Sequence, residues 1–289
     1  MRLKGGLGNQ LFQYAVAYSL AKRLRQTVQF NFALSRRMTR QKLDLAELNI
    51  EHHNFVESVD LPWQVNLLKN AYINKAIRML NCSKIPAGDY LYWIETRDEF
   101  QKAFFDIEAD NLYVDGYFSS AVYFQEYRKE LLSQFTPAYQ PEKQYLDMLE
   151  KIQTSNAVAV HIRRGDFMTS TSDFHYNLPI SYYTDAFEFI SCRVSRPIFF
   201  WFSNDIDWVI QTFGMKENYV FPQLKTTHAG IDDMMLMKNC KHIIAANSTF
   251  SWWAAWLNEN EHAYRIVPDR RFCVDDMNSG FWKKIHLDC

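Results

Sequence analysis

The second half of the chain repeats one pattern, in which a short apolar run is followed by a segment with helical spacing. Five such runs read as strands: AVAVHI (157–162), PIFFWFS (197–203), NYVFP (218–222), KHIIAAN (241–247) and YRIVP (264–268), the last of the series. PIFFWFS is apolar throughout, which is typical of a parallel strand covered on both faces. Strict alternation of strands and helices predicts a doubly wound α/β domain.

The first half is less regular. It opens with a strand stub and the glycine turn GGLGNQ, and then a helix in which Leu11, Ala15 and Leu20 recur at roughly helical spacing. Further elements are expected as strands at 26–32 and 111–118 and a helix at 119–135, with a mixed, helix-rich segment at 35–86.

A domain boundary is expected where the two halves meet. TPAYQP holds two prolines, Pro137 and Pro141, which interrupt any helix there. We place the boundary between about 136 and 156 and divide the chain into an N-terminal lobe, 1–150, and a C-terminal lobe, 151–289.

Charge and cysteine content exclude several classes of protein. With 32 basic and 33 acidic side chains the net charge is −1, so no global field favours nucleic acid, and an anion must be held locally. The five cysteines are odd in number and include no CxxC, which indicates reduced thiols rather than a disulfide framework or structural zinc. Without a secretory signal or an apolar run of roughly 18 residues, a cytoplasmic protein is expected.

Four segments lie where an expected strand hands over to a turn or helix: GGLGNQ (5–10), HIRRGDF (161–167), FSND (202–205) and ANSTFSWW (246–253). Ligands of doubly wound domains collect beyond the carboxyl ends of the strands. The shared placement therefore predicts that these segments form a ligand site.

HIRRGDF follows a buried strand with two adjacent arginines. An arginine offers a planar fork of donors that suits two phosphate oxygens. Neighbouring residues of an extended chain point to opposite sides, so only one arginine is expected to face a ligand. We assign that role to Arg163 and expect Arg164 to pair with Asp166. A solvated surface ion pair remains the alternative.

ANSTFSWW begins a helix at Asn247 or Ser248. Unbonded N–H groups of a first helical turn and the helix dipole favour phosphate, although an ordinary cap gives the same pattern. Its tryptophans, like most of the aromatic 16% of the chain, are expected to pack the core. The glycines of GGLGNQ allow a ligand to approach the backbone closely, but the loop lacks the lysine of a nucleoside-triphosphate loop.

Two acidic residues open the helix after FSND. Asp205 and Asp207 have the Asp-x-Asp spacing that holds Mg²⁺ or Mn²⁺ against a nucleotide diphosphate, although acidic residues are also common at helix starts. No pair of histidines has the spacing of a metal site.

Taken together, GGLGNQLFQYA, DGYFSSAVYF, HIRRGDF, FSND and NSTFSWWAAW resemble the bacterial α-1,2-fucosyltransferases, in matching order from Lys4 to about Asn258. HIRRGDF fits the HxRRxD signature shared with α-1,6- and protein O-fucosyltransferases. The resemblance implies an α/β, GT-B-like architecture of two Rossmann-like lobes, with the donor nucleotide in the C-terminal lobe and the site in the cleft between them.

The resemblance also implies an activity and its partners. It implies an inverting galactoside 2-α-L-fucosyltransferase that uses GDP-β-L-fucose, forms an α-1,2 linkage to a terminal β-galactose, and requires neither a metal nor another cofactor. It implies as acceptor a bacterial surface glycan or a lactose-type oligosaccharide. With a membrane-bound, lipid-linked acceptor, peripheral association at the inner membrane face is expected.

The resemblance assigns roles to particular residues. The catalytic group is Arg163, His161 and Asn9, with Arg163 on the β-phosphate, His161 beside the guanine and pyrophosphate, and Asn9 near fucose and acceptor. Donor contacts are further assigned to Asn204, Asp205, Asp232, Asn247, Ser248, Thr249 and Phe250, with Asp232 reading guanine. Support of the site is assigned to Arg164, Asp166, Gly6, Gly8 and Gln10.

The sequence leaves three points open. Family members carry a longer first strand than Met1 to Lys4. The base that deprotonates the acceptor is unassigned, with Glu95 as one candidate. A metal-dependent GT-A-type transferase using Asp205 and Asp207, or a non-catalytic nucleotide-sugar or glycan binder, would also account for parts of the pattern.

Overall fold

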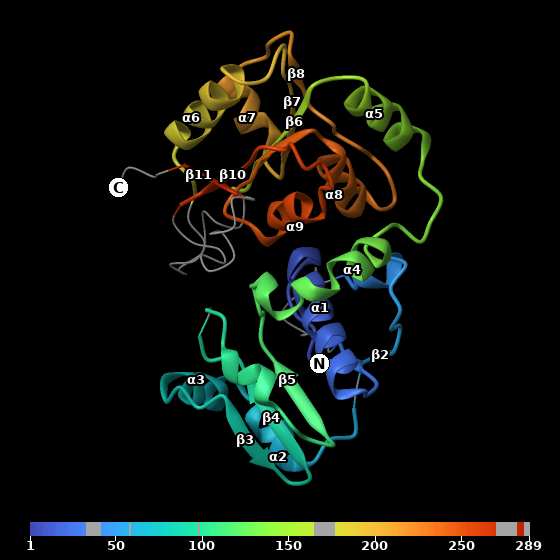
Figure 1. Ribbon diagram of the computed structural model, residues 1–289, viewed down its shortest axis with the longest axis vertical. Coiled ribbons are helices and arrows are strands. Elements are labelled where there is room, and N and C mark those ends of the chain that lie inside the picture. Colours follow the sequence, from blue (N-terminus) through green and yellow to red (C-terminus); the bar gives the residue numbers. More distant parts are fainter. Residues whose placement is uncertain (33–41, 58, 98, 165–176, 270–281, 286–289) are drawn as a thin grey trace. The chain divides into compact units, whose positions relative to one another are not determined.

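The computed structural model describes residues 1–289 except 33–41, 58, 98, 165–176, 270–281 and 286–289 (Figure 1). The chain divides into two compact units, Met1–Ala138 and Tyr139–Cys289. The division follows the first proline of TPAYQP, so helix α5 (Lys143–Gln153) belongs to the second unit, where it packs on α8 (Ala229–Asn239). Within the described part of the chain, no helix is long and apolar enough to span a membrane.

The second unit is built on a parallel sheet of six strands in its described part. Their order in space is β11-β10-β9-β6-β7-β8. Their bounds are β6 Ala157–Ile162, β7 Ile198–Ser203, β8 Tyr219–Val220, β9 His242–Ile244, β10 Arg265–Pro268 and β11 Lys283–Ile285. From β6 the chain adds strands first to one side and then to the other, so the order reverses between β6 and β9. That reversal defines the switch point of a doubly wound sheet.

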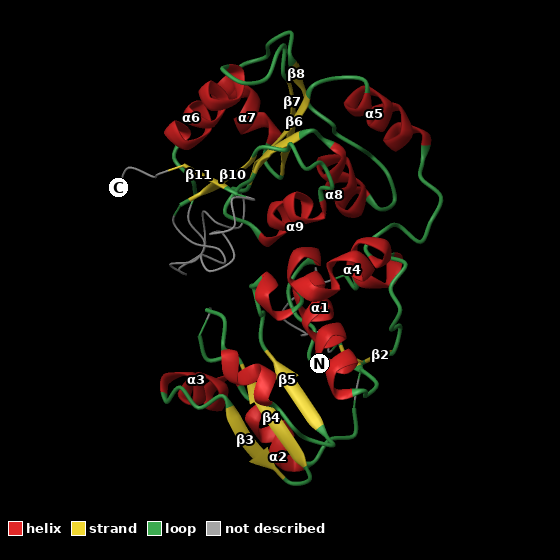
Figure 2. Cartoon of the chain, in the orientation of Figure 1, coloured by secondary structure: helices red, strands yellow, loops and turns green. Residues whose placement is uncertain are grey.

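Helices cover both faces of this sheet, as the apolar runs predict (Figures 1 and 2). They are α6 (Ile180–Ser191), α7 (Ile206–Phe213), α8 and α9 (Thr249–Leu257). Alternate residues of β6, among them Val158 and Val160, pack with Tyr182 and Ile190 of α6 in one buried cluster. The remaining β6 side chains, including His161, therefore face the opposite side of the sheet.

The first unit contains two small sheets that the N-terminal residues join. The pairs are β1 (Phe30–Asn31) with β2 (Phe55–Val56), and β3 (Lys84–Ala87) with β4 (Tyr90–Ile94) and β5 (Leu112–Asp115). Arg2 N–H donates to the Val114 carbonyl (2.9 Å), and Leu3 N–H donates to the Asn31 carbonyl (2.9 Å). The predicted strand stub is thus short but lies between β1 and β5.

Helices and 3₁₀ turns complete the first unit. The helices are α1 (Leu7–Leu24), α2 (Trp63–Leu68), α3 (Ala71–Met79) and α4 (Arg128–Gln134). The 3₁₀ turns are η1 (Asp44–Glu47), η2 (Lys102–Asp106), η3 (Ala121–Tyr123) and η4 (Gln125–Tyr127). The β3–β4 hairpin begins at the end of the predicted mixed segment, 35–86, and β4 lies beyond it, where the sequence predicted no element.

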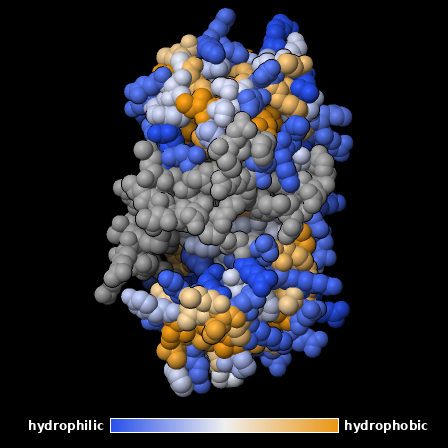
Figure 3. Space-filling model, turned by 90° about the vertical axis from the view of Figure 1, so that its left-hand side faces the viewer, coloured by the Kyte–Doolittle hydropathy of each residue, from blue (hydrophilic) through white to orange (hydrophobic). Residues whose placement is uncertain are grey.

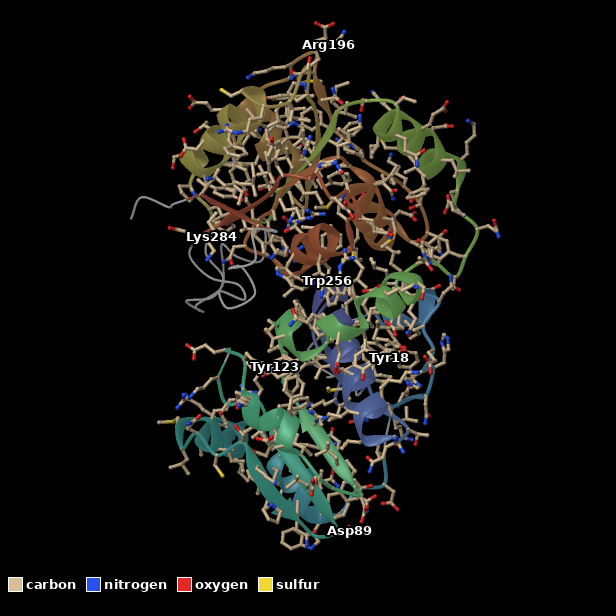
Figure 4. All side chains as sticks on the ribbon, viewed as in Figure 1. Tyr18, Asp89, Tyr123, Arg196, Trp256 and Lys284 are labelled. Carbon is tan, nitrogen blue, oxygen red and sulfur yellow. The ribbon has the colours of Figure 1, made fainter. Side chains whose placement is uncertain are left out.

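Aromatic side chains fill the cores, as their abundance predicts. Tyr123, labelled in Figure 4, packs edge-on to Phe104 and Phe118 at ring distances of 5.2 and 5.6 Å. In the second unit Trp252 and Trp253 of α9 are at most 2% exposed. The tryptophans of NSTFSWW are therefore core residues.

Several predicted boundaries were wrong. The strand at 26–32 contains only Phe30–Asn31, the helix at 119–135 breaks into η3, η4 and α4, and β11 follows the strand that was expected to be last. Within 119–135, Ser120 (φ −140°, ψ 130°) and Phe124 (φ −144°, ψ 3°) have backbone angles that a continuing α-helix does not allow. Helical spacing alone did not reveal these breaks.

A buried carboxylate ties the N-terminal residues to β5. Asp115 is 0% exposed and accepts from Arg2 Nη1 and Lys4 Nζ, both at 2.7 Å, and from the Tyr92 hydroxyl at 2.9 Å. Burial alone raises the pKa of Asp115, but the charges and hydrogen bonds of Lys4 and Arg2 outweigh it and hold the pKa well below its usual range. This network fixes both ends of the segment that enters the glycine turn.

We expect Asp115→Asn to lower the free energy of unfolding by about 2 to 4 kcal/mol at pH 7, because two partly buried cations lose their counter-ion. An acid with a depressed pKa stabilises the fold above its unfolded pKa, near ~4, and loses that effect as pH falls below it. Urea unfolding should therefore show the difference from wild type shrinking below about pH 4. The exposed Asp89→Asn is the control, and a loss of stability that does not vary with pH would contradict the ionic role.

Candidate donor-binding site

The central strand β6 ends at the predicted histidine and arginine pair. His161 is 4% exposed, its ring lies 5.5 Å from that of Phe250, and its backbone carbonyl accepts from the Tyr183 hydroxyl at 3.3 Å. Among the described residues, the buried His161 Nδ1 has no hydrogen-bond partner. Burial, reinforced by the Arg163 charge, lowers the pKa of His161 to about 3. His161 is therefore neutral at pH 7, with one ring nitrogen available to a ligand.

The loop after the neighbouring strand β9 supplies the second part of the site. Asn247 is 1% exposed, and Ser248 caps α9 by accepting from the Phe250 N–H at 3.3 Å. Ser251 Oγ donates to the Ala246 carbonyl at 3.3 Å and stiffens the turn. The sequence predicted this cap, and the first turn of α9 has the N–H groups and dipole direction that suit an anion.

The described contacts of Arg164 lie at the start of α7. Arg164 N–H donates to Asn204 Oδ1 (3.0 Å) and its Nε donates to Asp205 Oδ2 (3.4 Å). Its guanidinium lies 3.7 Å from the centre of the Trp208 ring. Arg164 is thus held by the start of α7. Asp166, its predicted partner, lies outside the described residues.

This arrangement changes the interpretation of FSND. Asp205 Oδ1 caps α7 by accepting from the Trp208 N–H at 3.3 Å, and its other oxygen pairs with Arg164. Asp207 is exposed. Within the described ranges no three histidine, cysteine or acidic side chains cluster as a metal site would require. Asn204 and Asp205, predicted to contact the donor, have a clear role here in positioning Arg164.

Asp232 lies on α8, buried to 1% exposure. Its Oδ1 accepts from the Tyr139 hydroxyl at 2.7 Å and its Oδ2 from the Thr226 hydroxyl at 2.5 Å, while the Tyr139 ring stacks on His228 at 3.9 Å. Burial, together with the Asp232 charge, raises the pKa of adjacent Asp233 to about 7. Sequence reasoning missed Tyr139 and Thr226 because no local pattern links Tyr139 to a carboxylate 93 positions away.

The glycine turn belongs to the first unit, and its own side chains hold it in place. Gly5 has φ +83°, and a Cβ there would lie 2.3 Å from Asn9 Nδ2, so only glycine fits. Gln10 Nε2 donates to the carbonyls of Gly5 (3.0 Å) and Lys42 (2.8 Å). Gly6 caps α1, and Gly8 is buried in its first turn.

Two more side chains of the first unit, Gln13 and Glu95, hold backbone groups in place. Glu95 was one candidate for the base that deprotonates the acceptor. Gln13, which was not predicted, accepts from Lys4 N–H (3.0 Å) and donates to the Gly116 carbonyl (3.0 Å). Glu95 is 2% exposed and accepts from the N–H groups of Tyr117 (2.7 Å) and Phe118 (2.8 Å), one to each oxygen. Glu95 therefore anchors a loop, which makes it a poor candidate for a base.

Within the second unit, two groups of predicted donor residues lie at the switch point. His161 lies near the end of β6 and Arg163 follows that strand, while Asn247 to Phe250 follow β9, its neighbour in the sheet. The other predicted donor residues lie after β7, at Asn204 and Asp205, and on α8, at Asp232. Asn9, Gly6, Gly8 and Gln10 gather in the first unit instead. The second-unit group combines a cation, a neutral histidine and a helix N-terminus, which together suit a negatively charged ligand.

Comparisons with known proteins agree with this chemistry. The family model for glycosyl transferase family 11 matches residues 1–276. Two Escherichia coli proteins are 29% identical: the O-antigen biosynthesis glycosyltransferase WbnK, over 93% of both chains, and an alpha-1,2-colitosyltransferase, over 96% of this chain and 93% of its own. The galactoside alpha-(1,2)-fucosyltransferase 2 of Hylobates lar is 24% identical over 93% of this chain and 72% of its own.

A solved structure shares the fold. The alpha-1,6-fucosyltransferase NodZ, soaked with GDP-fucose, superposes with a TM-score of 0.53 at 12% identity and covers 89% of this chain and 90% of its own. The fold is therefore GT-B-like, and fold and site together define a glycosyltransferase. The chain belongs to glycosyl transferase family 11.

The contacts of Arg164 with Asp205 and Trp208 predict that Arg164 stabilises the fold. We expect Arg164→Met to lower the free energy of unfolding by about 1 to 2 kcal/mol, because the ion pair with Asp205 and the stacking on Trp208 are both lost. The matched control is Arg193→Met, since exposed Arg193, just past the end of α6, stacks on Phe189 of that helix at 3.9 Å and should matter less. Equal losses in the two variants, measured by chemical denaturation, would contradict a special role for Arg164.

His161 leads to a pH prediction. A buried histidine with a lowered pKa stabilises the fold above its unfolded pKa, near ~6.5, and that contribution is lost as pH falls toward the folded value of about 3. Between pH 7 and 4, wild type should lose roughly 2 to 3 kcal/mol more stability than His161→Gln. The exposed His262→Gln is the control. Parallel pH profiles for wild type and His161→Gln would show that His161 is not held neutral.

Proposed function

We propose that the protein transfers L-fucose from GDP-β-L-fucose to the 2-hydroxyl of a terminal β-galactose, with inversion to an α-1,2 linkage. The observation that carries the proposal is the placement of Arg163 and of the capped N-terminus of α9. They follow the neighbouring strands β6 and β9, at the switch point of a GT-B-like fold. The relatives named for α-1,2-fucosyl and α-1,2-colitosyl transfer support the linkage.

The chemistry makes use of that pairing. As the bond between fucose and phosphate breaks, negative charge grows on GDP and positive charge on the sugar. Arg163 and the N–H group of Thr249 stabilise the charge on the pyrophosphate, and Ser248 fixes the turn by accepting from the Phe250 N–H. We propose that these groups replace a metal ion, so that no cofactor is needed.

Two further residues complete the donor site in this proposal. His161, neutral at pH 7, offers a hydrogen bond to the nucleotide without competing with Arg163 for negative charge. Asp232 reads the guanine base, because its oxygens each retain a lone pair after accepting from Tyr139 and Thr226. Arg164, Asn204 and Asp205 hold the strand end from which Arg163 projects.

A second donor is favoured by one relative. Colitose is L-fucose without the 3-hydroxyl, and an alpha-1,2-colitosyltransferase is 29% identical over 96% of this chain. Both sugars would be carried by GDP and would leave by the same chemistry. Competition between GDP-L-fucose and GDP-L-colitose in one reaction therefore decides which donor the site prefers.

Arg163 provides the test of the mechanism. We expect Arg163→Ala to reduce turnover of GDP-fucose on Galβ1,3- and Galβ1,4-terminated acceptors by roughly 10²- to 10³-fold, and Arg163→Lys to restore little, because lysine lacks the planar fork. Thermal unfolding monitors the fold. Near-normal turnover by Arg163→Ala would overturn the assignment.

The same assay tests the alternatives. Activity that is unchanged in EDTA supports the proposed mechanism, whereas activity abolished by EDTA and restored by Mn²⁺ would favour a metal-dependent transferase. GDP-fucose binding without turnover on any β-galactoside would favour a non-catalytic binder.

A further inference from the structure

A group of large apolar side chains lies exposed on two neighbouring helices of the first unit. We call it the α2–α3 surface, and its apolar members are Trp63 (70% exposed), Leu67 (48%), Tyr72 (86%), Met79 (79%) and Leu80 (78%). Figure 3 views the side on which α3 lies in Figure 1 and shows hydrophobic residues gathered on the first unit, with hydrophilic residues beside them.

These exposed residues are distinct from the residues with which the two helices pack on the core. Each helix has a separate buried face: Val65 and Leu68 on α2, and Ile73 and Ile77 on α3, pack with Tyr92 and other residues of one cluster. Trp63 and Leu67 are four positions apart, and Tyr72 and Met79 are seven apart, so each pair forms a stripe along its helix. The two helices therefore have a second apolar stripe in addition to the one that packs the core.

Charge points to the occupant of this surface. From Pro62 to Lys84 the chain has four basic residues, Lys69, Lys75, Arg78 and Lys84, and no acidic one, although the whole chain has a net charge of −1. Lys75 and Lys84 are exposed and form no ion pair with any described carboxylate. A local excess of positive charge beside exposed apolar groups complements a surface that is apolar in depth and negatively charged at its face.

The types of apolar residue agree with such a surface. Tryptophan and tyrosine have an apolar body and a polar tip, which suits the boundary between hydrocarbon and water. Lysines next to them can lay their stems along apolar groups while the ammonium reaches phosphate. A second protein chain would also cover apolar residues, but it would not in general require this one-sided charge.

We propose that the α2–α3 surface docks the protein on the surface of an anionic lipid bilayer. Trp63, Leu67, Tyr72, Met79 and Leu80 enter the headgroup boundary, and the exposed Lys75 and Lys84 contact lipid phosphates. The proposal concerns lipid binding alone and does not depend on the identity of the sugar donor or acceptor.

The test is binding of the full chain to vesicles of phosphatidylglycerol and phosphatidylcholine, 1 to 3, compared with phosphatidylcholine alone, in a flotation assay. We expect binding to the anionic vesicles that weakens in high salt. Tyr72→Ser with Met79→Ser should weaken it at least about 10-fold, because two side chains that enter the boundary are lost. The matched control, Met215→Ser with Leu146→Ser, removes exposed apolar groups of the second unit and should bind as wild type does.

Charge reversal separates the electrostatic part. Lys75→Glu with Lys84→Glu should remove the preference for phosphatidylglycerol, whereas Lys151→Glu with Lys225→Glu, exposed lysines of the second unit, should keep it. Tryptophan fluorescence should shift to the blue on vesicle binding, and Trp63→Phe should abolish the shift. All substituted side chains are exposed, so unchanged thermal unfolding will confirm that the variants fold.

Three results would overturn the proposal. One is no binding of wild type to anionic vesicles, and another is undiminished binding of Tyr72→Ser with Met79→Ser. The third is a concentration-dependent dimer that this double variant abolishes, which would make the α2–α3 surface an interface between copies of the chain.

Discussion

The reversal of strand order between β6 and β9 is the constraint on which the donor site depends. Parallel strands place their carboxyl ends at one edge of the sheet, and connections that leave in opposite directions open a space at the reversal. His161 and Arg163 stand at the end of one strand and Asn247 to Phe250 after the other. Arg163 and the first turn of α9 thus come after neighbouring strands, which is why we propose a site for a negatively charged ligand there.

Arg164 is held by residues at the start of α7, and it adjoins Arg163, the residue that we propose binds the donor. Arg164 is fixed by Asn204, Asp205 and the ring of Trp208, all at the start of α7. Because neighbouring side chains on an extended segment alternate, holding one arginine fixes the direction of the next. The acidic helix start that resembled a metal site is, on this view, part of what holds Arg164.

In the first unit, buried polar side chains hold the short N-terminal strand and the glycine turn in place. Its first strand is short, and Arg2 and Leu3 make only a few backbone hydrogen bonds with β5 and β1. Asp115, Gln10 and Gln13 compensate by holding the residues on both sides of the glycine turn. The α2–α3 surface lies on the same unit, which carries more of the exposed large apolar side chains than the second unit among the described residues.

The sequence by itself determined the alternating elements of the second unit and the cap of α9, because apolar periodicity and helix caps are local and each follows from a few neighbouring residues. Only the tertiary structure decided that Asp205 pairs with Arg164, that Tyr139 and Thr226 hold Asp232, and that Glu95 anchors a loop. These contacts join residues 6 to 93 positions apart, and which of many polar groups meet depends on how strands pack. The hairpin β3–β4 and the added strand β11 were missed for the same reason, since short strands owe their existence to partners distant in the chain.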